Sequence, residues 1–350
     1  MRMLMEKFGM LGSGSWATAL TKILTDKQQR VNWWIRNEAN VKHLRARRHN
    51  PAHLNSVNFD LSLLHLSTDL EEIISLSDVL VIGIPSAFIE ETLNQLPANS
   101  FEGKKVLSAV KGLLPGSNIL LNEYFNQRFG VPLNDYFAVL GPCHAEEVAA
   151  EKLSYLTFSG VDIPVASQLA ACFTTDYINT VVNHDILGVQ YAAVLKNIYA
   201  IGAGMAHGLD YGDNFLSVYI ANAADEMAEF LRRFGAEHIV VGEHQGQDPV
   251  THRKTPNYAA SVYLGDLLVT CYSLHSRNRT FGNMIGKGYS VRTAQLEMNM
   301  VAEGYNAARC IYMVNQSVQA PMPIVDAIYQ VLWEQLPPAQ GFWQIEQVLV

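Results

Sequence analysis

Residues 8–19 read Phe8-Gly9-Met10-Leu11-Gly12-Ser13-Gly14-Ser15-Trp16-Ala17-Thr18-Ala19, and they are the main reason for the fold that we expect in the first half of the chain. Its apolar run leads into Gly12-x-Gly14-x-x-Ala17, the spacing of the strand-to-helix turn that binds a dinucleotide. Gly12 allows a tight turn, Gly14 lets the backbone approach a pyrophosphate, and Ala17 permits close packing of helix on strand. The helix N-terminus offers N–H groups to the phosphates. A turn with a purely structural role is the alternative.

Short apolar runs recur through the first half and alternate with helix-like segments. The run from Val79 to Ile84 is apolar without alternation, as in a parallel strand buried on both faces. Strand–helix alternation predicts an α/β fold, with an N-terminal Rossmann-type doubly wound sheet. The predicted strands are 7–12, 30–36, 61–67, 78–85, 104–110, 136–142, 154–160 and 177–183, and helices are predicted at 70–76 and 87–96.

After about residue 185 the pattern changes to long apolar-periodic stretches, which predict a C-terminal all-helical domain. We therefore predict a dinucleotide-binding domain over residues 1–185 and a helical substrate or catalytic domain over 186–350. The polar stretch 235–257 is interpreted as a long loop or insertion. The predicted helices are 186–206, 214–234, 263–273, 293–316 and 324–334.

Composition limits the function classes. The net charge of −8 argues against nucleic-acid binding, because no cation surplus exists to displace counterions from a phosphate backbone. A small phosphorylated substrate needs only a local cationic cluster. The first strand begins near Lys7, which leaves no room for a signal-peptide core, and we judge no apolar run close to the ~18 residues that span a bilayer. We expect a soluble cytoplasmic protein without stable membrane insertion.

Cysteine and histidine spacing gives no metal signature. The four cysteines contain no Cys-x-x-Cys, so we expect free thiols. His238, His244 and His252 are too loosely spaced to favour a zinc site over a solvated loop. We predict no metal.

The end of the second predicted strand bears on cofactor choice. About twenty residues after the glycine turn, an NAD-selective site usually places Asp or Glu. This chain instead reads Trp34-Ile35-Arg36-Asn37. Arg36 is able to accept a 2′-phosphate or stack on adenine, which favours NADP use, alone or beside NAD, over NAD alone. An Arg36 that simply faces solvent is the alternative.

Lys196 is the only side chain charged at neutral pH within residues 186–206. A lysine inside a buried helix is costly unless it is paired or used. Helical spacing places Ala192, Ala193 and Ala200 on its face, and such small residues leave room for a ligand. The alternative is a lysine that extends to the surface.

Lys111 and Asp266 are two further isolated charges. Lys111 lies just beyond a predicted parallel strand, where ligands bind in open α/β sheets, although a surface lysine is equally compatible. Asp266 and Thr270 share a helix face, and an aspartate among apolar residues favours a cationic partner such as an active-site lysine. A helix N-cap is the alternative for Asp266.

The run Ser276-Arg277-Asn278-Arg279 combines hydroxyl, guanidinium and amide donors. Such groups hold a phosphate by several hydrogen bonds, and arginine adds bidentate geometry. A solvated basic turn is the alternative.

In their order along nearly the whole chain, these motifs resemble those of NAD(P)-dependent glycerol-3-phosphate dehydrogenases. The chain differs from the family pattern at Val110, where a hydroxyl residue is common before the lysine, and at Cys143, where threonine is frequent. It also lacks the Thr-Arg pair that is common within 217–222, a difference that affects what we expect of helix packing and subunit contacts. The matching motifs are Gly12-Ser13-Gly14-Ser15-Trp16, Lys111-Gly112, Gly141-Pro142-Cys143-His144-Ala145, Val194-Leu195-Lys196-Asn197, Gly265-Asp266-Leu267, Ser276-Arg277-Asn278-Arg279-x-Phe281-Gly282 and Val301-x-Glu303-Gly304.

The resemblance implies reversible hydride transfer between NADH or NADPH and dihydroxyacetone phosphate, with the active site between the two domains. It also implies a homodimer and a supply role in phospholipid synthesis. A related two-domain hydroxyacid or keto-acid dehydrogenase, or a non-catalytic dinucleotide sensor, are the alternatives. Lys196 would be the proton donor and acceptor, and burial and Lys111 would lower its pKa, a shift that Asp266 limits.

The resemblance also assigns site residues. The catalytic residues would be Lys196, Lys111 and Asp266. Substrate would be bound by Lys111, Gly141, Cys143, Asn197, Asp266, Thr270, Ser276, Arg277 and Asn278. Cofactor would be bound by Gly12, Gly14, Ser15, Trp16, Arg36, Lys111, Ala145, Arg277, Val301 and Glu303.

Overall fold

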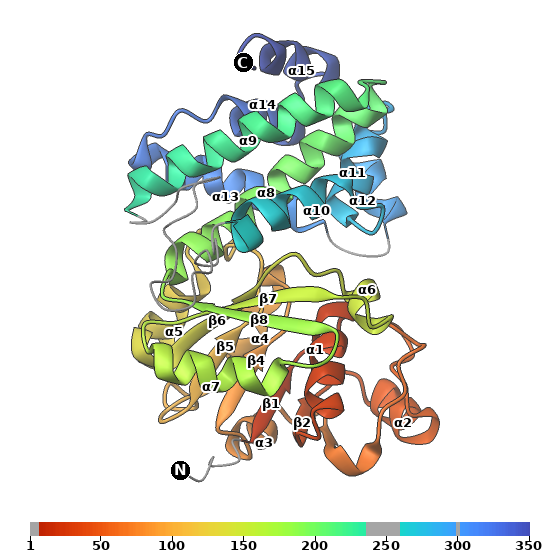
Figure 1. Ribbon diagram of the computed structural model, residues 1–350, viewed down its shortest axis with the longest axis vertical. Coiled ribbons are helices and arrows are strands. Elements are labelled where there is room, and N and C mark those ends of the chain that lie inside the picture. The colour runs from red at the N-terminus through yellow and green to blue at the C-terminus, as the bar shows by residue number, and fades with distance from the viewer. Residues whose placement is uncertain (1–6, 236–259, 299–301) are drawn as a thin grey trace, which may run out of the picture. The chain divides into compact units, whose positions relative to one another are not determined.

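The computed structural model describes residues 7–235, 260–298 and 302–350, which divide into two compact units (Figure 1). Unit 1, an α/β unit, contains residues 7–110 and 119–186. Unit 2, a helical unit, contains 111–118 and the described residues from 187 onward. The segment 111–118 therefore groups with the helices and not with the sheet that it follows. The Asn197 side chain helps to hold it there, because Asn197 Nδ2 donates to the Lys111 carbonyl oxygen at 3.0 Å.

Unit 1 is built on an eight-stranded sheet of order β3-β2-β1-β4-β5-β6-β7-β8. The first six strands are parallel in the order of a doubly wound dinucleotide-binding sheet, which confirms the predicted fold. β7 runs antiparallel to β6 and parallel to β8. All eight predicted strands are confirmed: β1 (Phe8–Leu11), β2 (Val31–Trp34), β3 (Leu64–Ser67), β4 (Val79–Ile82), β5 (Lys105–Ser108), β6 (Tyr136–Leu140), β7 (Ser154–Ser159) and β8 (Ile178–Asn183).

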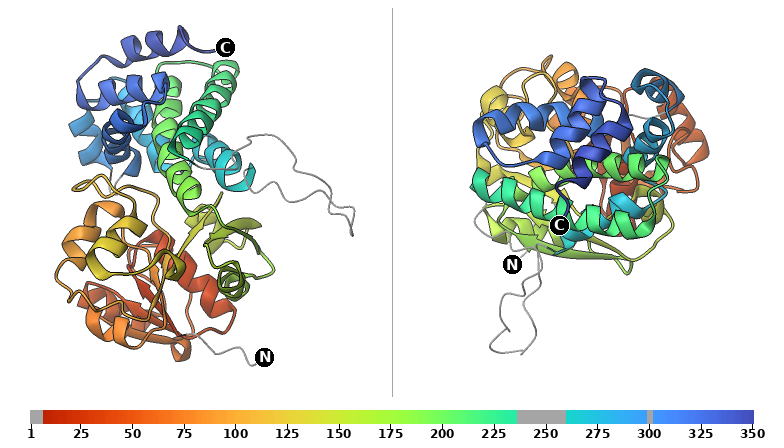
Figure 2. Two further views of the ribbon diagram at one scale, coloured as in Figure 1. Left: turned by 90° about the vertical axis from the view of Figure 1, so that its left-hand side faces the viewer. Right: turned by 90° about the horizontal axis from the view of Figure 1, so that it is seen from above.

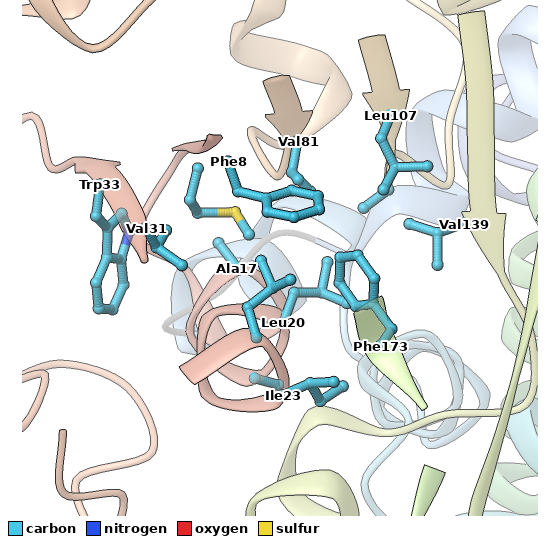
Figure 3. Close-up of a cluster of buried hydrophobic side chains, with 14 of the residues drawn as sticks. Phe8, Ala17, Leu20, Ile23, Val31, Trp33, Val81, Leu107, Val139 and Phe173 are labelled. Atoms are coloured by element: carbon cyan, nitrogen blue, oxygen red, sulfur yellow. The ribbon is translucent and has the colours of Figure 1, made fainter. Parts of the chain in front are cut away.

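One face of this sheet carries the hydrophobic cluster of Figure 3. Alternate residues point to the same face of a strand, so Phe8 and Met10 of β1 lie beside Val79 and Val81 of β4 in the cluster. The ring of Phe173 meets the ring of Phe8 edge-on, with centroids 5.9 Å apart. The helices that contribute to this cluster are α1 (Ser15–Asp26), α2 (Glu38–Arg47), α6 (Ala145–Ala149) and α7 (Ile163–Phe173).

The remaining elements of unit 1 are short. Among them, α5 packs Phe125 and Phe129 against Phe101, which forms a second aromatic group. These elements are α3 (Leu70–Ser75), α4 (Ile89–Leu93), α5 (Leu121–Phe129) and the 3-10 turns Leu61–Leu63, Ser86–Phe88 and Leu133–Asp135.

Every regular element among the described residues of unit 2 is a helix or a helical turn (Figure 2). The predicted single helix 293–316 is wrong, because α12 ends at Glu297 and α13 begins at Glu303. Most of the stretch predicted as a loop, 235–257, lies outside the described residues. The elements are α8 (Ile186–Gly208), α9 (Asp213–Phe234), a π-helical turn (Ala260–Gly265), α10 (Asp266–Tyr272), α11 (Arg277–Gly286), α12 (Val291–Glu297), α13 (Glu303–Val318), α14 (Pro323–Trp333) and α15 (Pro338–Glu346).

By length and composition α8 could cross a membrane, so our judgement that no apolar run comes close is wrong. The helix is the core of unit 2 instead, because 94% of its most apolar 18-residue window is buried inside the protein. It also carries the buried polar residues Gln190, Lys196 and Asn197, which find partners within a protein core. Burial against neighbouring helices thus explains its apolar composition.

Helices α8 and α11 touch through their backbones, at a contact that we name the glycine crossing. A Cβ atom at Gly204 of α8 would overlap the Arg279 carbonyl of α11, and one at Gly282 would overlap the Ile201 carbonyl. Any larger residue would push the helices apart. The close approach places the start of α11 beside Asn197. The crossing consists of Gly204 and Gly208 on α8 and Gly282 and Gly286 on α11.

Candidate active site

The glycine turn of unit 1 joins β1 to α1. Gly12 has a φ of +123°, and a Cβ there would lie 2.7 Å from the Gly83 carbonyl oxygen, so only glycine fits. The Trp33 indole N–H donates to the Gly12 carbonyl oxygen at 2.7 Å. No described atom lies within 4 Å of the place that a Cβ on Gly14 would take. This open space at the N-terminus of α1 fits the pyrophosphate of a dinucleotide.

Two of the residues expected to bind the dinucleotide, Ser15 and Arg36, lie at this turn and just after β2. Ser15 begins α1, and its hydroxyl is hydrogen-bonded to His53 Nδ1 at 3.2 Å. Asn50 Nδ2 donates to the Ser13 carbonyl oxygen and to Thr18 Oγ1. Neither His53 nor Asn50 stands out in the sequence, because the loop that carries them returns to the turn only in the folded chain. Arg36, just after β2, is exposed to solvent.

Gly141 and Cys143 lie between β6 and α6, and Ala145 follows them. Gly141 has a φ of +141°, and a Cβ there would lie 2.5 Å from the Tyr155 carbonyl oxygen. The Cys143 thiol donates to the same oxygen at 3.1 Å. Ala145 is the first residue of α6. The turn is therefore braced against β7, as close packing at this edge of the sheet requires.

Lys196 lies in the core of unit 2 and forms an ion pair with Asp266 Oδ1. Their side chains are 3% and 1% exposed, so solvent screens this pair little. Burial lowers the pKa of Lys196 to about 8; the Asp266 carboxylate opposes that shift and the Lys111 ammonium adds to it. The alternative of a Lys196 that extends to the surface is wrong, because its side chain is buried. The N-cap alternative for Asp266 is also wrong, because Gly265 occupies the N-cap of α10.

The second carboxylate oxygen of Asp266 is exceptional. Asp266 Oδ2 is buried and has no hydrogen-bond partner among the described residues. Thr270 Oγ1 donates to the Asp266 backbone carbonyl oxygen at 2.6 Å, so its hydroxyl hydrogen is used within the helix and not on Asp266 Oδ2. An unsatisfied buried acceptor costs about 1–3 kcal/mol, which makes Asp266 Oδ2 a candidate acceptor for a ligand hydroxyl.

Asn197 and Asn278 belong to a chain of hydrogen bonds that we name the amide relay. Asn197 Nδ2 donates to the Lys111 carbonyl oxygen at 3.0 Å, and Asn278 Nδ2 donates to Asn197 Oδ1 at 2.9 Å. The Gly304 N–H then donates to Asn278 Oδ1 at 2.9 Å. The relay connects the segment after β5 with α8, α11 and α13.

The run that begins at Ser276 is the N-terminus of α11 and not a solvated turn. Ser276 is 3% exposed, and its Oγ accepts the Arg279 N–H at 3.3 Å, so its hydroxyl caps the helix. Glu303 begins α13, and burial raises its pKa against the opposing charges of Arg277, Lys111 and Lys196. Unit 2 thus gathers three cations around Glu303. The expected cofactor residue Val301 lies outside the described residues.

Metal chemistry finds no support in the part of the chain that the structure describes. No group of three or more His, Cys, Asp or Glu side chains there could hold a metal ion. None of the four cysteines, which all lie within the described residues, forms a disulfide. His238, His244 and His252 lie outside the described residues.

Solved structures share this architecture. A glycerol-3-phosphate dehydrogenase from Coxiella burnetii superposes with a TM-score of 0.85 at 25% identity, covering 98% of this chain and 99% of that chain. A D-mandelate dehydrogenase in complex with NADH reaches a TM-score of 0.58 at 12% identity, over 94% of this chain and 98% of that chain. The second likeness shows a shared fold alone.

Sequence relatives point to one family. Glycerol-3-phosphate dehydrogenase (NAD(P)+) of Chlorobium limicola is 33% identical over 332 residues, 95% of this chain and 94% of that protein. The enzyme of the same name from Bacillus subtilis is 33% identical over 94% of this chain and 90% of its own length. Residues 7–165 match the family's N-terminal domain, and residues 185–342 match its C-terminal domain. The chain therefore belongs to the NAD-dependent glycerol-3-phosphate dehydrogenase family.

Proposed function

We propose that this protein reduces dihydroxyacetone phosphate reversibly to sn-glycerol 3-phosphate with NADH or NADPH. The observation that carries the proposal is the buried pair of Lys196 and Asp266, with Asp266 Oδ2 left as an open acceptor. A proton donor beside a vacant hydroxyl acceptor suits a substrate that alternates between a ketone and an alcohol.

Unit 1 is proposed to bind the cofactor, which supplies the hydride for C2 of the substrate. The glycine turn receives the pyrophosphate at the N-terminus of α1, and Arg36 receives the adenosine end, including a 2′-phosphate when one is present. The proposed cofactor contacts are Gly12, Gly14, Ser15, Trp16, Arg36, Lys111, Ala145, Arg277, Val301 and Glu303.

Lys196 is proposed as the general acid and base. In the reductive direction its ammonium donates a proton to the oxygen that forms on C2, and the neutral amine accepts that proton in the oxidative direction. A pKa of about 8 makes both protonation states accessible near neutral pH. Asp266 orients the amine and accepts a substrate hydroxyl at Oδ2.

The substrate phosphate is proposed to lie at the start of α11. Arg277 supplies a bidentate donor, Asn278 supplies an amide hydrogen, and Lys111 adds a positive charge. Ser276 Oγ accepts the Arg279 N–H as the cap of α11, which leaves its hydroxyl hydrogen for the phosphate. Gly141 and Cys143 of unit 1, and Asn197 and Thr270 of unit 2, complete the proposed substrate contacts.

The decisive experiment follows the near-ultraviolet absorbance of the reduced nicotinamide with purified protein and dihydroxyacetone phosphate. We expect oxidation of NADH or NADPH that is lost when unphosphorylated dihydroxyacetone replaces the substrate. A panel of 2-keto acids tests the related-dehydrogenase alternative in the same assay. Protein that binds NADPH but oxidises it with none of these compounds would support the sensor alternative and overturn the proposal.

We also infer a cytoplasmic homodimer that supplies glycerol 3-phosphate for phospholipid synthesis. Val218 of α9 and Leu268 and Tyr272 of α10 are exposed apolar side chains, and Ser217 Oγ lies 3.4 Å from the Tyr272 hydroxyl. We propose this apolar surface as the contact between the two copies. Sedimentation velocity tests the inference, since a chain of 38.9 kDa that stays monomeric at assay concentrations would contradict it.

A further inference from the structure

The direction of the amide relay is fixed at both ends by the backbone. The Lys111 carbonyl oxygen only accepts and the Gly304 N–H only donates, so each amide between them fits in one orientation. Turning either amide over would bring two donors or two acceptors face to face. The side chains of Asn197 and Asn278 are 4% and 8% exposed, so water cannot readily replace a lost partner.

We propose that Asn197 and Asn278 are positioning residues whose amide relay holds Lys111 against Lys196 and fixes the start of α13, where Glu303 lies. This inference rests on the proposed function, in which Lys196 moves the proton. It adds a role to two residues that we otherwise expect to touch substrate. Each amide nitrogen carries two hydrogens, and the relay uses one, so the second remains for a ligand.

The charges around Lys196 make the relay measurable. Asp266 and Cys271 face it from α10, Lys111 faces it from the segment after β5, and Glu303 faces it from α13. The Lys111 ammonium lowers the pKa of Lys196. If the relay releases Lys111, this like-charge repulsion weakens and the pKa of Lys196 rises. Looser packing around Lys196 would also raise this pKa, because burial is the largest cause of its shift, so the effect of the relay has to be separated by removing Lys111 as well.

The test is a pH titration of Lys196 in the full-length protein without substrate. Isotope-labelled lysine side chains are followed by NMR, and Lys196→Met identifies the signal. We expect Asn278→Leu to move the midpoint upward by about one pH unit. Asn283→Leu is the matched control, because Asn283 also lies on α11 and its Oδ1 has no partner among the described residues. Its titration should equal that of the wild type.

A double-mutant cycle shows whether the effect passes through Lys111. Lys111→Met should raise the midpoint in the wild type but add little in the Asn278→Leu background, because the repulsion has already been relieved. Equal shifts in both backgrounds, or no shift from Asn278→Leu, would overturn the proposal. If Asn278→Leu fails to fold, Asn278→Ser replaces it, since the shorter side chain cannot reach both relay partners.

The two proposals fail in different ways. Since the titration needs no turnover, an inactive protein that shows the shift would keep the relay and lose the proposed function. If the enzyme is active but Lys196 titrates with the same midpoint in the wild type and in Asn278→Leu, the proposed function stands and the proposed role of the relay is overturned. A rate assay adds that Asn278→Leu should shift the pH midpoint of kcat as well as raise KM.

Discussion

Lys196 is the residue whose loss should affect the rate most. Lys196→Met keeps the length and apolar stem of the side chain but removes the proton, so kcat should fall by about 10²–10⁴-fold. Steady-state rates provide the measurement, and unchanged NADPH binding shows that unit 1 is intact. Lys287→Met, at an exposed position, is the control and should keep its rate. Near-normal turnover of Lys196→Met would assign the proton transfer to another group.

The pKa of Lys196, lowered by burial to about 8, predicts opposite pH dependences for the two directions. Reduction needs the ammonium, so its kcat should fall as the pH rises through about 8. Oxidation needs the neutral amine, so its kcat should rise over the same interval and then level off. Initial rates in both directions across this range test the prediction. Profiles that move in the same direction would be incompatible with one shared acid–base group.

At the residue scale the sequence predicts charges better than hydrogen bonds. Lys196 and Asp266 stand out because an ionic side chain in an apolar stretch must be paired or used, and the structure pairs them. The amide relay leaves no such trace. Asn197 and Asn278 are 81 residues apart, and asparagine is unremarkable in either place. For the run that begins at Ser276 the sequence predicts a phosphate site, with a solvated turn as the alternative, and the cap that Ser276 forms on α11 appears only in the fold.

At the scale of the element, the N-terminus of α14 depends on a buried carboxyl group. Glu226 of α9 accepts the N–H groups of Ile324 at 2.7 Å and Val325 at 3.0 Å, and the Tyr199 hydroxyl donates to it at 3.1 Å. These hydrogen bonds lower its pKa, but burial outweighs them and raises the pKa to about 8. The group therefore binds a proton in the native state that the unfolded chain releases.

This linkage predicts the effect of Glu226→Gln. Between the ordinary glutamate pKa of 4.5 and about 8, the native wild type holds the extra proton, so its stability should fall as the pH rises. The glutamine variant lacks this dependence. Its urea midpoint should therefore gain on that of the wild type between pH values of about 5 and 8. A difference that stays constant with pH would show that Glu226 titrates normally.

The glycine crossing predicts a steric effect. Gly282→Ala would drive a methyl group into the Ile201 carbonyl, and overpacking of this kind costs about 1–3 kcal/mol. Gly212→Ala is the control, because no described atom lies within 4 Å of its Cβ position, and it should cost less than about 1 kcal/mol. Thermal unfolding measures both. If both variants lost the same free energy of unfolding, α8 and α11 would be able to move apart at the crossing without a cost in stability.

Helices and strands could be predicted wherever a hydrophobic pattern is compatible with only one kind of secondary structure. The continuous apolar run of β4 is a buried strand, and the structure confirms it. The direction of β7 was not predictable, because strand residues look alike in either direction and the reversal arises from the connection. The predicted helix 293–316 failed since apolar periodicity carried on past Met298, where α12 is capped. α11 was missed because its early turns are rich in arginine and asparagine.

At the scale of the whole molecule, each of the two units has its own set of buried side chains. The net charge of −8 coexists with the local cations Lys111, Lys196 and Arg277, so attraction of a phosphorylated substrate must be local to unit 2. Arg36 belongs to unit 1 and is exposed to solvent, and Arg277 belongs to unit 2. Changes at the two positions should therefore act independently.

A double substitution tests this independence. Arg36→Ala should weaken NADPH binding about tenfold and spare NADH, while Arg277→Ala should mainly raise KM for the phosphorylated substrate. With NADPH, the loss of kcat/KM in the double variant should equal the product of the single losses within a factor of about two. A larger deviation would mean that the two arginines share a partner.

The hydrogen bond from Trp33 holds an indole ring beside the glycine turn, and this position should make the intrinsic fluorescence of the protein sensitive to a bound cofactor. Trp33 is fully buried and donates to the Gly12 carbonyl oxygen, and Trp16 lies on the first turn of α1. Indole emission overlaps the absorption of a reduced nicotinamide, so a dinucleotide bound here would quench the intrinsic fluorescence by energy transfer. Trp333 and Trp343 belong to the helical unit. The chain thus carries its own reporter of cofactor occupancy, and binding can be titrated without label, substrate or turnover.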